Sequence, residues 1–372
     1  MARKTVYPIV PDYASPPGAT LAETLEARNM TQAELAERTG RPLKTINEIV
    51  KGKSAITADT AVQLERVLAV PAKLWLQLEA NYQEALAREK EARVHEQQTE
   101  WLKSFPLAEM IKQRWVEKRT TISEQVAAIL AFFGVASVEA WQSVWCRRLE
   151  SSVAYRKAAT FEMSASAAAA WLRRGEIEAT QAECSPYDER KFRQALRMIR
   201  GMTKDPVASF APATKKLCAN AGVAVLFVHE LPKVPVSGAA YWLNSKKAVI
   251  QLSLRYKSND HLWFSFFHES GHILKHGKRD FFLEGLPVSD ESAKQETWEA
   301  EADEFARDFL IAPEDWDEFV ADGIFEEATV DRFAKRQGIA AGIVVGRLQR
   351  EKHLSYQTRL NSKKVRLKWA DD

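Results

Sequence analysis

Cysteine is scarce in this chain of 372 residues. The three cysteines, Cys146, Cys184 and Cys218, are odd in number and far apart in the sequence. Small secreted domains are held together by several cysteine pairs, so this pattern excludes a disulfide framework and favours a reducing compartment. The chain also contains no C-x-x-C pair, which excludes a zinc knuckle built from cysteines.

Long apolar stretches are also lacking. No run of eighteen or more apolar residues occurs, and the N-terminal segment has no apolar core typical of a secretion signal. We therefore expect a cytoplasmic protein that does not span a membrane. The net charge of +3 is too small to predict nucleic-acid binding by itself, so any contact with DNA must come from a local patch. The length predicts two or three domains.

One segment carries a metal-binding pattern. The stretch HLWFSFFHESGHILKHG contains His268, Glu269 and His272 in the spacing H-E-x-x-H. Residues four apart on a helix lie on one face, so both imidazoles can bind one metal ion at about 2.0–2.1 Å. Glu269 then lies beside the ion, where a general base can take a proton from water.

The same segment has the signals of a buried helix. Asn259 or Asp260 is a suitable N-cap, and Gly277 suits the position after the last turn. Apolar and aromatic side chains, such as Phe266, surround the helix. Burial would keep the site dry and strengthen its electrostatic interactions.

A second predicted helix supplies a third ligand. In the stretch WEAEADEFA, Glu299 and Asp303 share one face with two alanines, whereas Glu301 points away from that face. We predict Glu299 as the ligand and Asp303 as the acceptor of the outward N–H of a ligating histidine. Two histidines and one glutamate leave a fourth position open, as in catalytic zinc sites, whereas structural sites have four protein ligands.

Other interpretations of these residues stay open. The H-E-x-x-H motif alone also arises by chance. His276 follows His272 by four residues, but it lies two helical turns from His268, too far to share the ion. We therefore expect His276 either at the surface or behind a ligand.

These segments resemble a known family. The stretches GAAYWL, KAVIQLSLRY, DHLWFSFFHESGHILKHG and EAEADEFARDFLIAP, between Gly238 and Pro313, are similar to the ImmA/IrrE zinc peptidases. The resemblance implies a zincin-like α+β domain, Zn²⁺ as the cofactor and Glu299 as the third ligand. It also implies an intracellular enzyme that cuts a regulatory protein, such as a helix-turn-helix repressor.

The N-terminal part has the signals of four short helices. Thr31 to Glu34 form a capping box, Gly40 suits the following turn, and Pro42 stands near the start of the third helix. Thr57 is a suitable cap for the fourth helix. A helix, a short turn with glycine and a second helix are typical of a helix-turn-helix unit.

The third of these helices is the predicted recognition helix. Its apolar side chains face the core, which leaves polar side chains for a DNA groove and basic ones for phosphates. The predicted DNA contacts are Arg41, Lys44, Thr45, Asn47, Lys51 and Lys53. The alternative is a four-helix bundle with a solvated basic face, because such residues are common on any surface.

This part resembles the XRE-type helix-turn-helix family, and especially HigA-like antitoxins. Between Ile46 and Leu76 it matches I-x-x-I-x-x-G-K-x-x-I-T, then A-x-x-L-x-x-x-L, a proline and a Trp-Leu pair. The resemblance implies base contacts at the start of the third helix. It also implies binding of a palindromic double-stranded DNA operator as a homodimer.

The fold class predicted from these patterns is mainly α with a smaller α+β part. A strand is expected at Val223–Val228 and a hairpin around Asn244. A sheet edge beside the active-site helix would hold an extended peptide substrate. The four predicted parts are a helix-turn-helix domain at 1–80, a helical connector with core tryptophans at 81–212, a zinc peptidase domain at 213–350, and a basic tail at 351–372. The last stretch of the tail, SKKVRLKWADD, is expected to be mobile.

We therefore expect a DNA-binding transcriptional regulator with a zinc-dependent endopeptidase domain. The substrate would be a repressor, a toxin–antitoxin partner or the protein itself. Tyr241, Arg255 and Tyr256 are candidates for stabilising the oxyanion. The alternative is a HigA-like antitoxin whose zincin-like domain senses a ligand or binds a partner without proteolysis, and the intact Glu269 favours the enzyme.

Overall fold

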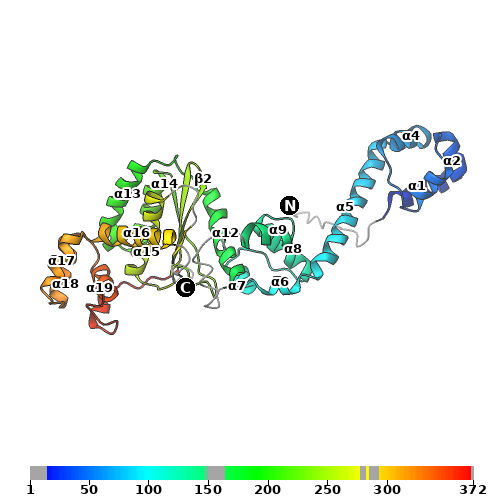
Figure 1. Ribbon diagram of the computed structural model, residues 1–372. Helices are drawn as coiled ribbons and strands as arrows, with labels where there is room; N and C mark the ends of the chain where they lie inside the picture. Colours follow the sequence, from blue (N-terminus) through cyan, green and yellow to red (C-terminus); the bar gives the residue numbers. More distant parts are fainter. Residues whose placement is uncertain (1–14, 147–148, 150–163, 277–281, 285–292, 370–372) are drawn as a thin grey trace, which may run out of the picture. The chain divides into compact units, whose positions relative to one another are not determined.

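The computed structural model describes residues 15–146, 149, 164–276, 282–284 and 293–369 (Figure 1). The chain divides into two compact units. One contains residues 1–98 with 121–124, and the other contains residues 99–120 with 125–372. Each unit is described by itself.

The first unit is helical. Its helices are α1 (Pro17–Ala27), α2 (Gln32–Thr39), α3 (Leu43–Val50), α4 (Ala58–Leu68) and α5 (Ala72–Glu96). Their apolar faces meet in one core, which includes the fully buried side chains of Leu21, Leu35, Ile46, Leu64 and Trp75. Helix amphipathicity thus accounts for the assembly of this unit.

The predicted turn and cap signals are confirmed. Thr31 Oγ1 accepts the Glu34 backbone N–H at 3.1 Å, and Thr57 Oγ1 accepts that of Thr60 at 3.4 Å. Gly40 ends α2 with φ of 69°, a left-handed conformation that favours glycine. These signals fix the turn between α2 and α3.

Helix α5 is longer than the predicted first domain allows. It runs without a break from Ala72 to Glu96, so the predicted boundary at residue 80 falls inside it. Glu79 is buried and accepts the Ile56 backbone N–H at 2.9 Å, which ties α5 to the loop after α3. The division between the compact units lies near residue 98 because α5 belongs to the first core.

The second unit contains a four-stranded sheet in the order β1-β3-β2-β4. The central strands β2 (Gly238–Asn244) and β3 (Lys247–Leu252) form the predicted antiparallel hairpin, and β1 (Val223–Phe227) is the predicted strand, parallel to β3. A short strand, β4 (Phe282–Glu284), pairs with residues 238–240 of β2. The predicted free edge is therefore covered along those residues.

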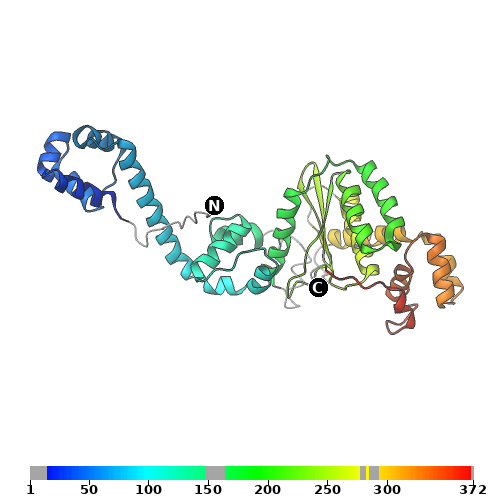
Figure 2. The ribbon, with the colours of Figure 1, turned by 180° about the vertical axis from the view of Figure 1, so that it is seen from behind.

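Helices cover both faces of this sheet (Figure 2). Helix α12 (Ala165–Gln181) lies on one face, and α13 (Glu189–Gly201), α14 (Val207–Ala219) and α15 (Asn259–Lys275) lie on the other. The predicted start of the peptidase domain at residue 213 falls inside α14. Helices α12 and α13, assigned to the connector by sequence, pack on the sheet and belong to its layers.

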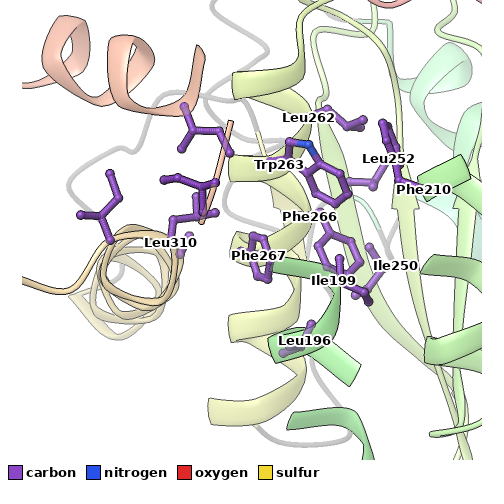
Figure 3. Close-up of a cluster of buried hydrophobic side chains, with 14 of the residues drawn as sticks. Leu196, Ile199, Phe210, Ile250, Leu252, Leu262, Trp263, Phe266, Phe267 and Leu310 are labelled. Atoms are coloured by element: carbon purple, nitrogen blue, oxygen red, sulfur yellow. The ribbon is translucent and has the colours of Figure 1, made fainter. Parts of the chain in front are cut away.

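Helix α15 is the buried centre of this unit. Trp263 and Phe266 point from it toward Ile250 and Leu252 of β3, and Phe267 lies toward Leu310 (Figure 3). All of these side chains are almost fully buried. The predicted buried helix is confirmed.

The predicted N-cap of α15 was wrong. The cap position is Ser258, and both Asn259 and Asp260 are buried inside the first turn. Asn259 Oδ1 accepts the Val365 backbone N–H at 2.9 Å, and the Asp260 carboxylate binds Lys364 Nζ at 2.6 Å. These side chains therefore hold the C-terminal segment. The predicted end at Gly277 lies outside the described residues.

The chain closes with helices and a docked segment. The elements are α16 (Ala293–Leu310), α17 (Pro313–Ala321), α18 (Glu327–Gln337), α19 (Ala341–Arg350) and the 3-10 helix η4 (Arg359–Lys363). Leu367 is buried, and Trp369 Nε1 donates to Glu230 at 3.0 Å. The mobility predicted for residues 362–372 is therefore wrong up to residue 369, because this segment packs on the second unit.

The segment at residues 122–146 is by length and composition apolar enough to cross a membrane. It is divided into α8 (Ile122–Phe133), α9 (Val138–Trp141) and the π-helix η1 (Gln142–Cys146), with Gly134 at φ of 68° after α8. All three elements contribute buried side chains to one core, in which α6 (Thr99–Lys103) and α7 (Leu107–Lys112) also pack. This arrangement is typical of a protein core and confirms the predicted core role of Trp141.

Candidate metal centre and DNA-binding surface

Helices α15 and α16 approach each other closely because small residues line their contact. Ala302 and Ala306 of α16 are fully buried, as the shared helix face predicts. A Cβ atom added at Gly271 of α15 would lie 3.2 Å from the Ala302 Cα. This close approach brings the acidic face of α16 to the two histidines of α15.

Three side chains meet where the two helices touch. His268 Nε2 lies 3.0 Å from His272 Nε2 and 3.3 Å from Glu299 Oε2, and His272 Nε2 lies 3.5 Å from Glu299 Oε1. Ligands at about 2.0–2.1 Å in a tetrahedral site are separated by roughly 3.3 Å. The donor types and their spacing therefore fit a zinc ion with one open position, as predicted from the sequence. Among the described residues, His268, His272 and Glu299 form a group whose donor atoms are close enough together to hold one metal ion.

Glu269 is fully buried beside this cluster, between α15 and β2. Gly238, the first residue of β2, provides the space for it. A Cβ atom at Gly238 would lie 2.5 Å from Glu269 Oε1 and 2.8 Å from its Cγ, closer than real Cβ contacts. Sequence reasoning missed Gly238, and the only signal was a glycine at the start of a predicted strand.

An acidic partner supports the first histidine. His268 Nδ1 lies 2.9 Å from Asp303 Oδ1, and Arg350 Nη2 donates to Asp303 Oδ2 at 2.7 Å. With Nε2 directed to the metal position, Nδ1 carries the proton and donates to Asp303. This is the contact predicted for Asp303, and Arg350 is an additional partner that the sequence did not indicate.

The second histidine has a longer chain of support. His272 Nδ1 lies 3.0 Å from His276 Nδ1, and His276 Nε2 lies 3.0 Å from Glu301 Oε2. If His272 Nε2 faces the metal, its Nδ1–H donates to His276, whose Nε2–H donates to Glu301. His276 is thus buried behind His272, the predicted ligand, which is one of its two expected places. Glu301 does point away from the ligand face, but toward His276.

The surroundings set the charge of these groups. Burial lowers the pKa of His272 well below its usual value, and His268 and His276 lower it further. A histidine with a low pKa is neutral at pH 7, which is the form that binds a metal ion. Burial raises the pKa of Asp303, but the bond to His268 and the charges of His268 and Arg350 outweigh burial, so this pKa is below its usual value. Asp303 is therefore ionised and can accept a hydrogen bond from the His268 Nδ1–H.

Replacing Glu301 by alanine should weaken zinc binding about tenfold, because outer acidic partners typically contribute ten- to a hundredfold in metal affinity. The measurement is competition for zinc with a fluorescent chelator. Glu304→Ala is the matched control, since Glu304 is an exposed acid on the same helix. Equal affinity of both variants and the wild type would show that the His276–Glu301 pair does not support His272.

The three oxyanion candidates lie in different surroundings. Tyr241 is buried in the core on the α12 face of the sheet, away from α15, and its hydroxyl donates to Gln251 at 3.3 Å. Tyr241 is therefore excluded by its position. Arg255 donates to the Pro235 carbonyl, and Tyr256 stacks on His261 with ring centroids 4.2 Å apart.

The predicted recognition helix α3 presents polar side chains outside its core face. Ile46 and Ile49 are buried, whereas the Lys44 side chain is 84% exposed. Asn47 Nδ2 donates to Gln32 Oε1 of α2 at 3.3 Å, a contact that sequence reasoning missed. Gln32 therefore orients Asn47 at the junction of α2 and α3.

The basic residues at the two ends of α3 differ in their contacts and exposure. Arg41 Nε donates to Gln63 Oε1 of α4 at 2.5 Å, which holds Arg41 beside the bundle. Lys51 and Lys53 are exposed after α3, and Thr45 is half-buried on it. The six predicted contacts are therefore close together along α3 and its two ends.

Comparison with known proteins identifies the class of the first unit. The family described as "Helix-turn-helix" matches residues 21–75. Residues 21–75 are therefore a helix-turn-helix domain, as predicted. No curated protein matches the chain.

The solved structures similar to this chain cover less than a quarter of it. An addiction module antidote protein of the HigA family from Coxiella burnetii is 30% identical, with a TM-score of 0.21, over 23% of this chain and 92% of that one. The Pseudomonas aeruginosa antitoxin HigA, solved with the higBA promoter, is 29% identical, with a TM-score of 0.21, over 22% and 89%. PA4674 from the same organism, solved with its operator DNA, is 28% identical, with a TM-score of 0.22, over 23% and 94%.

Proposed function

We propose that this protein is a DNA-binding regulator with a zinc-dependent endopeptidase domain of the ImmA/IrrE type. The observation that supports the enzyme is the cluster of His268, His272 and Glu299, whose donor atoms lie 3.0–3.5 Å apart beside a buried Glu269. Three protein donors leave the fourth position of a tetrahedral ion for water or substrate.

Each residue has a distinct role in peptide hydrolysis. A zinc ion bound by His268, His272 and Glu299 would polarise the scissile carbonyl and make a nearby water more acidic. Glu269 takes the proton from the attacking water and then gives it to the leaving amine. The buried position of Glu269 keeps competing water away from its carboxylate and strengthens its interaction with the reacting groups.

The substrate class is proposed from the domain that shares the chain with the metal cluster. Because that domain is a helix-turn-helix domain, we propose that the substrate is a regulatory protein: a repressor, a toxin–antitoxin partner or the protein itself. An extended segment would lie along the sheet beside α15, as in strand addition. Strand β4 already pairs with residues 238–240 of β2, so such a segment must use another part of the edge or displace β4.

The assay begins with the zinc-bound full chain and the same chain stripped with a chelator. Both are incubated with the protein itself and with peptides from a cell lysate, and new cuts are read by mass spectrometry. We expect defined cuts that require zinc and return when zinc is restored. Bound zinc without any cut would instead assign the domain to binding a ligand or partner without proteolysis.

We also propose that the helix-turn-helix domain binds operator DNA in the cytoplasm. Two proteins similar to it were solved with a promoter or an operator. Asn47 can read adenine in the major groove, while Lys44, Lys51 and Lys53 lie where phosphates can be bound. Binding of a palindrome as a homodimer is part of this proposal.

Asn47→Ala should weaken binding to the preferred operator about tenfold, because one bidentate base contact contributes about 1–3 kcal/mol of discrimination. The operator is first selected from random DNA, and affinity is then measured by fluorescence anisotropy. Gln77→Ala, which removes an exposed amide from α5, is the control. An unchanged affinity and an unchanged base preference in Asn47→Ala would contradict a role in base recognition.

A further inference from the structure

A cavity of about 560 Å³ lies behind the metal cluster, among α15, α16, α19 and the C-terminal segment. Its volume is within the usual range for small-molecule sites. None of His268, His272 and Glu299 lines it. Its walls combine an apolar part with charged side chains, and the charged ones are Asp260, Asp303, Arg307, Arg347, Arg350, Glu351 and Lys364.

One buried carboxylate in this cavity lacks a partner for one of its oxygens. Asp260 is only 7% exposed, and its Oδ2 binds Lys364 Nζ at 2.6 Å. Its Oδ1 is buried and has no hydrogen-bond partner among the described residues. A buried acceptor without a donor costs about 1–3 kcal/mol. An N–H or O–H group of a bound molecule would remove this cost if it reached Oδ1.

The backbone is shaped around this carboxylate. A Cβ atom at Gly346 of α19 would lie 2.6 Å from Asp260 Oδ2 and 3.0 Å from its Cβ. Glycine at this position lets α19 pass directly over the Asp260 side chain. The carboxylate is thus held from two sides, by Lys364 and by α19.

Arg350 also lines this cavity, and its guanidinium is largely exposed. The Arg350 side chain is 60% exposed, and one nitrogen donates to Asp303 Oδ2 at 2.7 Å. A guanidinium has five N–H donors, so this bond leaves others for an anion. Arg347 differs, because its side chain is only 11% exposed and binds Glu351 and the Ile311 carbonyl. Arg307 is paired with Asp308 at 2.7 Å, and Lys364 is paired with Asp260. Arg350 is thus the most exposed of the cavity's cations and the best placed to meet an anion.

We infer that this cavity binds a small organic anion, a carboxylate or a phosphate monoester, that also carries an N–H or O–H donor. The anionic group binds Arg350, the donor binds Asp260 Oδ1, and the body of the molecule packs on Phe264, Leu310 and Ile343. Two-point recognition of this kind selects against simple inorganic ions and against neutral molecules.

The cavity is joined to the metal cluster by a chain of contacts. Arg350 binds one oxygen of Asp303, and the other oxygen binds His268. An anion that attracts Arg350 weakens the hydrogen bond between Arg350 and Asp303. The change in Asp303 then alters its hydrogen bond with His268, a proposed metal ligand. We expect the bound molecule to change zinc affinity, and this part alone rests on the proposed zinc site. A change in affinity must then be reciprocal between the two ligands.

The test is a thermal-shift screen of the full chain against small carboxylates and phosphates, including glycyl-L-leucine and adenosine 5′-monophosphate. Calorimetry follows for every stabilising compound, and it distinguishes carboxylates from phosphates. We expect a compound of one class to bind, and its neutral ester or parent alcohol to bind at least tenfold more weakly. A screen without any stabilising acid would overturn the inference.

Two variants locate the binding. Arg350→Met should raise the dissociation constant at least tenfold, whereas Arg336→Met should not change it. Arg336 is a suitable control because its side chain is 50% exposed and also pairs with a carboxylate, Glu318, at 3.1 Å. Equal binding to Arg350→Met and the wild type would place the compound elsewhere and contradict the inference.

Zinc titration with and without the bound compound tests the coupling separately. A shift in zinc affinity in the wild type that is absent in Arg350→Met supports the chain through Asp303. Binding of the compound without any shift would overturn the coupling and leave the binding site itself established. Failure of the chain to bind zinc at all would contradict the proposed enzyme, and the calorimetry would still decide on the cavity.

Discussion

Glu269→Gln should lower the rate of zinc-dependent cleavage by about 10³-fold while zinc content stays at the wild-type level. A positioned general base contributes typically 10²–10⁴-fold, and glutamine has nearly the same shape but cannot take a proton. The ligands His268, His272 and Glu299 are unchanged, so metal binding should persist. The measurements are the rate of cutting of a peptide found in the substrate screen, and zinc content by mass spectrometry.

The control for this variant is Glu304→Gln, which makes the same chemical change at an exposed acid of α16. It should retain the wild-type rate. Operator binding should be the same in all three proteins, because the helix-turn-helix domain contains neither position. If Glu269→Gln cleaves as fast as the wild type with zinc still bound, Glu269 is not the base and the proposed mechanism is wrong.

The metal cluster could be predicted because it depends on local geometry. His268 and His272 share a helix face by their spacing alone, and the alternation of acids and alanines marked one face of the second helix. The structure brings Glu299 to both histidines and Asp303 to His268. The two alanines on the same face predicted that the second helix approaches the first, and the family resemblance agreed with this pairing.

The supporting contacts could not be predicted, because they depend on how separate elements pack. His276 had two expected places, and only the packing of α16 against α15 decides that it lies between His272 and Glu301. Arg350 follows Asp303 by 47 residues, and no local pattern relates the two. Long-range pairs of this kind leave no periodic signal in one sequence.

The wrong predictions of the α15 N-cap and of the tail have the same cause, which is packing between distant segments. Asn259 and Asp260 have the residue types of an N-cap, but the C-terminal segment uses them as partners, which displaces the cap to Ser258. The charged tail looked mobile because its basic residues carry no apolar pattern, yet Lys364 and Leu367 anchor it. Tertiary contacts overrode local propensity at both places.

Gly238→Ala should lower the cleavage rate about a hundredfold with zinc still bound. The added methyl would lie 2.5 Å from Glu269 Oε1 and 2.8 Å from its Cγ, so the carboxylate must move. A displacement of about 1 Å at a catalytic group can cost about 10²-fold. Alanine suits a strand better than glycine does, so the change is expected to disturb the carboxylate more than β2 itself. Gly201→Ala is the matched control, because a Cβ there meets nothing within 4 Å.

A double-mutant cycle decides whether Gly238 acts through Glu269. If the methyl acts only by displacing the base, adding Gly238→Ala to Glu269→Gln should cause no further loss, since the base is already absent. A further hundredfold loss in the double variant would mean that the substitution disturbs the substrate or the metal ligands instead. Glycine at position 238 would then be required by the sheet beside α15 and not by the position of the Glu269 carboxylate.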